Sequence, residues 1–254
     1  MISKMPVLFL THGAPLWLTD PEKGELLGAW GKALPTPKSI LIVSGHWETE
    51  DVVVGEECTH NNLIYDFGGF PKELYQFQYP APAPLDLSKR LGELLNKDLA
   101  KSTRGLDHGV WVPLYHMWPE ANIPILQISQ PVGLDAQGLF KFGQALAPLR
   151  EEGVMIIGSG SATHNLGMLD WNGGEPNKVT TDFDDWIEMA LSGKDKEALV
   201  NFKTASPSYK INHPTDDHFL PLLIAAGAGW DSEVTYPISG YDYANLSYKM
   251  AAFG

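Results

Sequence analysis

The sequence contains little cysteine, because Cys58 is the only one among its 254 residues. A single cysteine cannot close an internal disulfide, so nothing points to a disulfide-stapled secreted protein. Glu56 and Glu57 precede Cys58 and disfavour the reactive thiolate form of its side chain. We therefore expect this cysteine to be structural.

Positive charge is also scarce. The chain has 18 lysines and arginines against 31 aspartates and glutamates, which gives a formal net charge of -13. Nucleic acids and anionic membranes are bound by basic patches, so the composition argues against both as partners. No apolar run is long enough for a signal peptide or a membrane span. A cytoplasmic protein is the default expectation, and no heptad or apolar stripe decides whether it forms a homo-oligomer.

The usual short signatures of metal and nucleotide sites are missing. The sequence has no His-Glu-x-x-His, no paired Cys-x-x-Cys and no EF-hand loop. The segment Gly158-Ser159-Gly160-Ser161 follows an apolar run, but it lacks the lysine of a P-loop and the glycine spacing of a dinucleotide fold. The Gly-x-Ser-x-Gly pattern of serine hydrolases is not matched, because a pattern that starts at Gly158 has Gly160 at the serine position and Ala162 at the last position. The glycines of this segment are more simply explained by a tight turn.

What the sequence does have is one construction that occurs three times, a short apolar run followed by a histidine. The runs begin at residues 7, 39 and 154, and the histidines that follow them are His12, His46 and His164. Short runs that are apolar on both faces predict buried central strands of a parallel sheet. Parallel strands end at one edge, where open α/β sheets place their ligands, so we expect these three histidines to meet there.

The chain as a whole predicts one α/β domain over residues 1–254. Its expected architecture has three layers, a central mostly parallel, mixed sheet flanked by helices. Asp135 and either Thr215 or Asp216 are expected to cap helices, and Pro221 has to fall early in its helix. Further strands are expected over 51–56, 123–129 and parts of 233–253, and helices over 22–34, 85–100, 135–150, 181–191, 195–202 and from 215 to 226.

Histidine is a common ligand of divalent metals because its neutral imidazole offers a nitrogen near pH 7. A lone histidine after a strand is more often structural, but three at equivalent strand ends favour a functional site. His108 and His218 also lie in conspicuous local settings. His60, His116 and His213 do not, and we expect them to be structural, with His213 close enough to His218 to support it.

Aromatic residues accompany the histidines in the predicted loops. They would suit an aromatic substrate, although aromatic loop residues serve packing just as often. The candidates are Tyr65, Phe67, Phe70, Trp111 and Trp17.

With these residues in view, the chain resembles the class III extradiol ring-cleaving dioxygenases of the LigB-like family, and among them the DOPA dioxygenase type. The matching segments are THGAP at 11–15, VSGHWET at 43–49, YDFGGFP at 65–71, LDHGVWVPL at 106–114, GSGSATHNL at 158–166 and DHFLPL at 217–222. Because they span nearly the whole chain in order, chance similarity is improbable.

The resemblance implies one mononuclear metal site. His12, His46 and His218 match family ligands, and His164 matches a histidine at the metal's edge that ligates it, acts as acid or base, or does each in turn. His108 matches a histidine placed to hydrogen-bond the substrate or bound oxygen, so His108 and His164 are the catalytic candidates. The ion would be Zn(II) or Fe(II), because an all-histidine site suits either and only iron changes its redox state.

The implied activity is opening of the ring of a catechol, a DOPA-like dihydroxyphenyl compound, with dioxygen as co-substrate. Tyr65, Phe67 and Trp111 are the candidate substrate contacts. Two alternatives remain open, a zinc-dependent hydrolase acting at the same metal and a non-catalytic metal-binding scaffold. The acidic composition suits a carboxylate-bearing catechol poorly, unless a local cation such as Lys72 or Arg104 helps.

Overall fold

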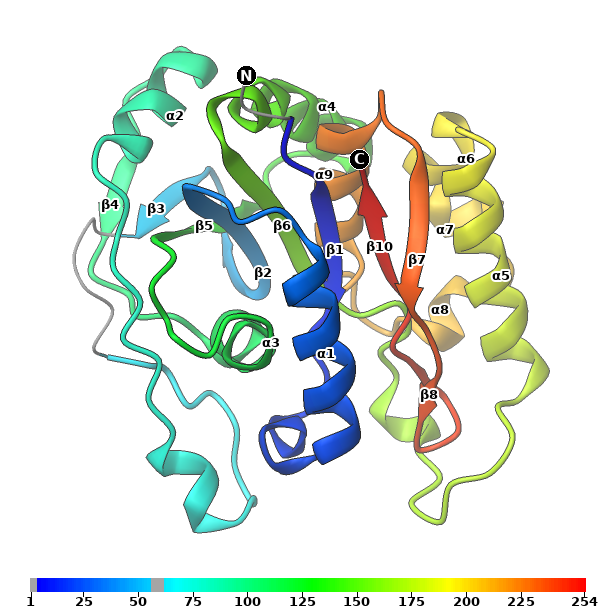
Figure 1. Cartoon of the computed structure of the whole chain (residues 1–254). Coiled ribbons are helices and arrows are strands. Elements are labelled where there is room, and N and C mark those ends of the chain that lie inside the picture. The colour runs from blue at the N-terminus through cyan, green and yellow to red at the C-terminus, as the bar shows by residue number, and fades with distance from the viewer. Residues whose placement is uncertain (1–3, 56–61) are drawn as a thin grey trace.

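An eight-stranded sheet forms the centre of the computed structural model, which describes residues 4–55 and 62–254 (Figure 1). Its order is β4-β3-β5-β2-β6-β1-β10-β7. The strands are β1 Val7–Thr11, β2 Ser39–Thr49, β3 Val53–Gly55, β4 Ala100–Ser102, β5 Ile125–Pro131, β6 Val154–Gly160, β7 Val234–Ile238 and β10 Met250–Phe253, and β8 Tyr241–Asp242 pairs separately with β9 Leu246–Ser247. Cys58 and His60, for which we expect structural roles, lie outside the described residues.

The three strands that precede the repeated histidines are neighbours in this sheet. β6 pairs in parallel with β1 on one side and with β2 on the other, and β5 continues the parallel set beyond β2. β10 pairs antiparallel with β1 and β7, and β3 pairs antiparallel with β5. The sheet is therefore mostly parallel but mixed, which confirms the predicted fold class.

Helices cover both faces of the sheet (Figure 1). They are α1 Pro21–Ala33, α2 Leu87–Leu95, α3 His108–Met117, α4 Ala136–Leu146, α5 Lys178–Ser192, α6 Lys196–Val200, α7 Phe202–Ala205, α8 Tyr209–Asn212 and α9 Leu220–Gly229. Short 3-10 turns span Pro15–Thr19, Lys72–Gln76, Ala147–Glu152 and Leu166–Met168. Asp135 caps α4 as predicted, because its side chain accepts a hydrogen bond from the backbone N–H of Gly138.

The alternation of side chains along the strands explains the two helical layers. In β1, Val7 and Phe9 join one apolar cluster, while Leu8 and Leu10 join the other. The first cluster includes side chains of α4, α5 and α9, and the second includes those of α1 and α3. Because both faces are buried, the central strands read as continuous apolar runs rather than as alternating ones.

One strand differs from the sequence-based expectation. β2 does not end at Ser44-Gly45 but continues to Thr49, with a register irregularity between Val43 and Glu48. Such a local irregularity lets a strand go on while its side chains are redirected. The tail expected over 233–253 provides β7, which lies at the edge of the sheet, and β10, which lies between β7 and β1.

The helix expected from residue 215 begins instead at Leu220, and neither Thr215 nor Asp216 caps it. Pro221 explains the later start. A proline ring clashes with the carbonyl four residues before it in a helix, so proline is confined to the first turn. His218 consequently lies in the segment that leads into α9 rather than inside the helix.

Candidate metal centre and substrate cavity

Five histidines of the described part of the chain line one cavity of about 280 Å³ at the carboxyl edge of the parallel strands. They are His12, His46, His108, His164 and His218. The structure thus brings together the three histidines that follow the apolar runs, as the sequence predicts. His108 and His218 join them. His116 and His213 do not line this cavity.

Different elements deliver these side chains. His12 directly follows β1, His46 lies in the irregular part of β2, and His164 follows β6 by four residues. His108 is the first residue of α3. The pairing of β1 and of β2 with the parallel strand β6 between them stops at the same level, so residues far apart in the sequence reach the same point.

Glycines bring the segment before α9 close to the sheet. A Cβ at Gly160 would lie 2.1 Å from the carbonyl oxygen of His218, and one at Gly45 would lie 2.8 Å from that of Asp217. The backbone N–H of Ser161 donates to the His218 carbonyl at 2.9 Å. Glycine at these two positions therefore allows His218 to reach the point where the pairing of β2 with β6 ends.

The hydrogen bonds of Ser159 determine the tautomer of His12. The Ser159 hydroxyl donates to the carbonyl oxygen of Gly109 at 2.5 Å, and its oxygen lies 3.0 Å from Nδ1 of His12. Having used its proton, the hydroxyl can only accept from His12. We therefore assign the proton of His12 to Nδ1, which leaves a lone pair on Nε2.

Asp66 serves two histidines at once. One carboxylate oxygen accepts from the backbone N–H and from Nδ1 of His108, at 3.0 and 2.8 Å, while the other lies 3.3 Å from Nδ1 of His46. Burial opposes ionisation of Asp66, but the hydrogen bond from the His108 side chain prevails and lowers the pKa of Asp66 to about 2. Asp66 is thus an anion that orients the His108 ring by a hydrogen bond and lies close to Nδ1 of His46, which favours an Nδ1 proton and an Nε2 lone pair on both rings.

Asp217 plays the same part for its neighbour, because its carboxylate accepts from Nδ1 of His218. The His218 ring in turn stacks on the ring of His164, with centroids 3.6 Å apart and planes 9° from parallel. Ligating histidines in metalloproteins commonly donate their second N–H in this way. The lone pair of His218 is therefore also on Nε2.

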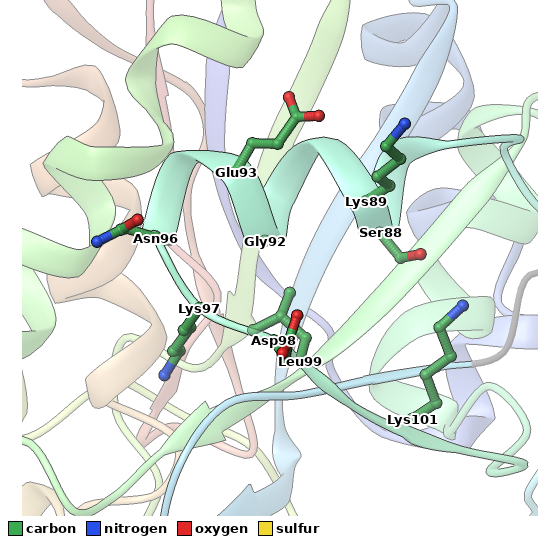
Figure 2. Close-up of a pocket in the computed structure, with 9 residues that line it drawn as sticks. All are labelled: Ser88, Lys89, Gly92, Glu93, Asn96, Lys97, Asp98, Leu99 and Lys101. Atoms are coloured by element: carbon green, nitrogen blue, oxygen red, sulfur yellow. The ribbon is translucent and has the colours of Figure 1, made fainter.

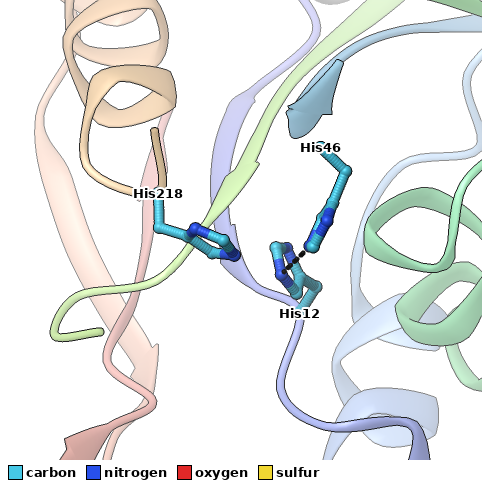
Figure 3. Close-up of side chains that lie close together, drawn as sticks. All are labelled: His12, His46 and His218. Atoms are coloured by element: carbon cyan, nitrogen blue, oxygen red, sulfur yellow. Dashed lines mark hydrogen bonds between the residues drawn. The ribbon is translucent and has the colours of Figure 1, made fainter. Parts of the chain in front are cut away.

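The arrangement fits a divalent metal ion. The Nε2 atoms of His12 and His46 lie 3.1 Å apart, and Figure 3 shows the ring of His218 directed toward the same point. Ligand atoms of the three rings lie within 4.8 Å of one another. Two nitrogens bound at about 2.1 Å to one ion are themselves roughly 3 Å apart. Because the Nδ1 protons are engaged elsewhere, facing Nε2 lone pairs repel unless a cation or an added proton joins them.

Burial keeps the imidazoles neutral and hence able to bind a metal. It lowers the pKa of His12 well below the usual value, and the nearby histidines lower it further. Burial is also the main cause that lowers the pKa of His46 and of His164, each to about 3. Near neutral pH these rings offer lone pairs rather than positive charges.

Of the three aromatic residues expected to contact substrate, the structure puts Phe67 in the cavity wall. Tyr65 and Trp111 are not among the lining residues. The Tyr65 hydroxyl donates to the carbonyl of Phe77, and the fully buried Trp111 donates to that of Ile64. Both rings lie beside Phe67, so this geometry favours a supporting role, and direct contact with substrate stays a prediction for these two.

Sequence reasoning missed the carboxylates beside the histidines and a whole wall of the cavity. Asp66 and Asp217 had a signal, since one lies in a matching loop and the other directly precedes His218. The missed wall comes from residues 241–248, where two-residue strands give no usable periodicity. Its lining residues are Asp242, Tyr243, Leu246, Ser247 and Tyr248.

The two other described histidines have structural partners. Nε2 of His116 bonds to the carbonyl of Trp17 at 2.9 Å, and Nε2 of His213 bonds to that of Ala162 at 2.8 Å. A separate hollow of about 560 Å³ lies beside α2 and β4. Figure 2 shows Lys89 and Glu93 pointing away from Lys101 there, so its polar groups do not converge as the histidines do.

Comparison with known proteins agrees with this site. Residues 7–254 match the family of the catalytic LigB subunit of aromatic ring-opening dioxygenase. The chain is 41% identical to a 4,5-DOPA dioxygenase extradiol of Beta vulgaris, covering 96% of this chain and 95% of that protein. It is 37% identical to a 4,5-DOPA dioxygenase extradiol of Escherichia coli K12, covering 99% and 96%.

A solved structure shares the fold. An uncharacterized protein of Escherichia coli K12 superposes with a TM-score of 0.82 at 33% identity, over 98% of this chain and 100% of that one. Within residues 4–55 and 62–254, no helix has the length and apolar character needed to cross a membrane.

Proposed function

The chain belongs to the LigB family of aromatic ring-opening dioxygenases and is an extradiol ring-cleaving dioxygenase, and on that premise we propose that its substrate is a DOPA-like catechol. The family, together with the histidine and aspartate cluster, indicates a metal ion. The observation that carries the proposal is the convergence of three Nε2 lone pairs, from His12, His46 and His218, beside a cavity walled by aromatic rings.

We assign metal binding to His12, His46 and His218, with His164 at the edge of the set. We further propose Fe(II), because reduced iron can pass electron density from a bound catecholate to dioxygen whereas zinc has no redox change. The nitrogen donors suit zinc equally well, so the choice of iron rests on the chemistry of the reaction. Asp66 and Asp217 hold the ligand rings in place through their Nδ1 protons.

His108 is suited to move a proton at Nε2. Its Nδ1 donates to Asp66 at 2.8 Å, which leaves the lone pair of Nε2 available in the cavity. When Nε2 takes the proton of a catechol hydroxyl, the resulting imidazolium is stabilised by the carboxylate behind it. His164 also lines the cavity and supplies a second acid or base, or a further ligand.

The cavity walls are suited to a flat aromatic substrate. Phe67, Phe70 and Trp17 line the cavity, and the rings of Tyr65 and Trp111 pack behind Phe67. Aromatic rings prefer offset or edge-to-face contacts of this kind. A catechol held by these walls presents its two adjacent hydroxyls to the histidines.

Oxygen consumption tests the proposal. Protein loaded anaerobically with ferrous iron should consume oxygen and form a yellow product with DOPA or simple catechols, while zinc-loaded protein should do neither. The variant His108→Ala should keep its metal and lose turnover, whereas His12→Ala should lose the metal. If the iron-loaded protein consumes no oxygen with any catechol, the proposal is contradicted. If the zinc-loaded protein turns over a polar substrate without oxygen, the hydrolase is favoured instead.

A further inference from the structure

The ionisable groups of the cavity are unevenly distributed. Among residues 4–55 and 62–254, Asp242 is the one ionisable residue besides the histidines and tyrosines that lines it, and these residues contribute no lysine or arginine to the lining. Lys72 and Arg104, the two cations considered above for binding a carboxylate-bearing substrate, are not lining residues. The side chain of a substrate therefore meets a carboxylate on the wall made by β8 and β9.

Asp242 is held firmly from behind. One carboxylate oxygen lies 2.9 Å from Nζ of Lys23, and the other accepts from Nε1 of Trp17 at 2.8 Å. The Lys23 ammonium lies 3.4 Å from the ring centroid of Tyr248, and its side chain is 7% exposed against 23% for Asp242. Lys23 thus stands behind the wall and Asp242 in it.

The carboxylate of Asp242 makes this wall complementary to a cationic group of a substrate. A carboxylate has about four acceptor sites, so the bonds from Lys23 and Trp17 leave capacity for a further donor. The rings of Tyr243 and Tyr248 line the cavity beside Asp242, and aromatic faces also attract ammonium groups. Burial of Lys23 opposes its charge, but its bond to Asp242 prevails and raises its pKa, so Lys23 is positively charged at neutral pH.

We propose that Asp242 is a specificity-determining residue that receives the ammonium group of an aminoalkyl catechol. This inference rests on the proposed ring cleavage at the histidine cluster. A catechol that carries an ammonium on its side chain gains a charge-assisted hydrogen bond. A catechol that carries only a carboxylate places an anion beside an anion and is disfavoured.

The test uses three matched substrates with iron-loaded protein. They are 4-methylcatechol, 2-(3,4-dihydroxyphenyl)ethylamine and 3-(3,4-dihydroxyphenyl)propionate, which differ in side-chain charge. The readout is kcat/KM for each charged substrate divided by kcat/KM for 4-methylcatechol, because this ratio cancels losses of folded or metal-loaded protein. For the natural sequence we expect a ratio of about ten or more for the amine and below one for the propionate.

Two variants separate charge recognition from a structural role. Asp242→Asn leaves Lys23 without its anion, so the amine ratio should fall about tenfold and the propionate ratio should rise above that of the amine. In the double variant Lys23→Met and Asp242→Asn, both ratios should approach one. Asp185→Asn, an exposed carboxylate on α5, is the matched control and should keep the natural ratios.

The outcomes are distinguishable. If 4-methylcatechol is cleaved but the amine ratio is near one, or if Asp242→Asn leaves both ratios unchanged, the assignment of Asp242 is wrong and ring cleavage stands. If no catechol is cleaved, the proposed function fails. The equilibrium binding of the amine and the propionate to the same protein then decides the assignment, because Asp242→Asn should reverse their order of affinity.

Discussion

At the scale of single residues, Asp66 is the group on which two histidines depend. Its two oxygens serve His108 and His46, so an amide in its place can accept at only one of them. The other oxygen site becomes an N–H2 group facing an N–H donor. Asp66 therefore links the proposed metal ligand to the proposed proton carrier through one carboxylate.

The variant Asp66→Asn should bind metal about 10 to 100 times more weakly, as is typical when a group that orients a ligand is altered. Turnover at saturating metal should fall as well, because the His108 imidazolium loses its anion. Competition with a chromophoric chelator measures the affinity. Asp98→Asn, at an exposed carboxylate in the hollow beside α2, is the control, and natural affinity in Asp66→Asn would refute the shared role.

His213 should make the stability of the fold depend on pH. It is fully buried, Nε2 donates to the carbonyl of Ala162, and its Nδ1 has no hydrogen-bond partner among the described residues. Burial is the main cause that lowers the pKa of His213 from 6.5 to about 4. Below pH 6.5 the unfolded chain takes up a proton that the folded chain refuses, so stability is complete above that pH and falls toward pH 4.

In metal-free protein, His213 should account for roughly 3 kcal/mol of the unfolding free energy lost between pH 7 and pH 4. Urea unfolding at several pH values measures the loss. The variant His213→Gln, whose amide can still donate to Ala162, should show a shallower decline. A parallel decline in the two proteins would mean that this histidine does not contribute.

At the scale of elements, the wall made by β8 and β9 is anchored to α5 by one buried carboxylate. Asp184 accepts from the hydroxyls of Ser247 and Tyr241 at 2.5 and 3.2 Å, and it lies 3.1 Å from Nζ of Lys249. Lys249 also pairs with Glu188 at 2.7 Å. A wall that carries Asp242 and Ser247 into the cavity is therefore fixed by a helix outside it.

The variant Asp184→Ala should lose about 3 kcal/mol of unfolding free energy, the lower end for a broken buried pair, because Glu188 still faces Lys249. It should also raise KM for all catechols alike, because the wall loosens without changing its charge. Urea unfolding and steady-state kinetics measure the two effects. Asp185→Ala, at the next and exposed position, should change stability by no more than about 0.5 kcal/mol, and equal effects in both variants would count against the anchor.

Elements also show what the sequence can predict. β1, β2 and β6 are predictable because each is a local apolar run, and the meeting of their histidines follows from parallel geometry alone. β4 and the β8 and β9 pair are two or three residues long, which is too short for periodicity to reveal. The roles of Asp242 and Asp184 depend on partners such as Lys23 and Ser247, far along the chain, and no local pattern encodes those contacts.

At the scale of the whole molecule, the sheet order decides where the chemistry lies. β6 occupies the place between β1 and β2, so the pairing of both ligand-bearing strands with β6 ends beside its glycine-rich turn. The segment that contains His218 lies much later in the sequence, and it packs against this edge through the hydrogen bond from the Ser161 N–H to the His218 carbonyl. Of the proposed ligands, His12 and His46 belong to the two N-terminal strands and His218 to the segment that leads into α9. Only folding brings these segments together.

A metal bound by ligands so far apart in the sequence should stabilise the whole fold, because the unfolded chain cannot assemble the site. At a free-ion concentration 100 times the Kd the gain is about 2.7 kcal/mol, which for a chain of this size corresponds to roughly 5 to 10 °C in Tm. Chelation should therefore lower Tm by that amount, and zinc or anaerobic ferrous iron should restore it. His12→Ala should abolish the shift and His116→Gln should keep it, whereas a shift that survives His12→Ala would show that the stabilising ion binds elsewhere.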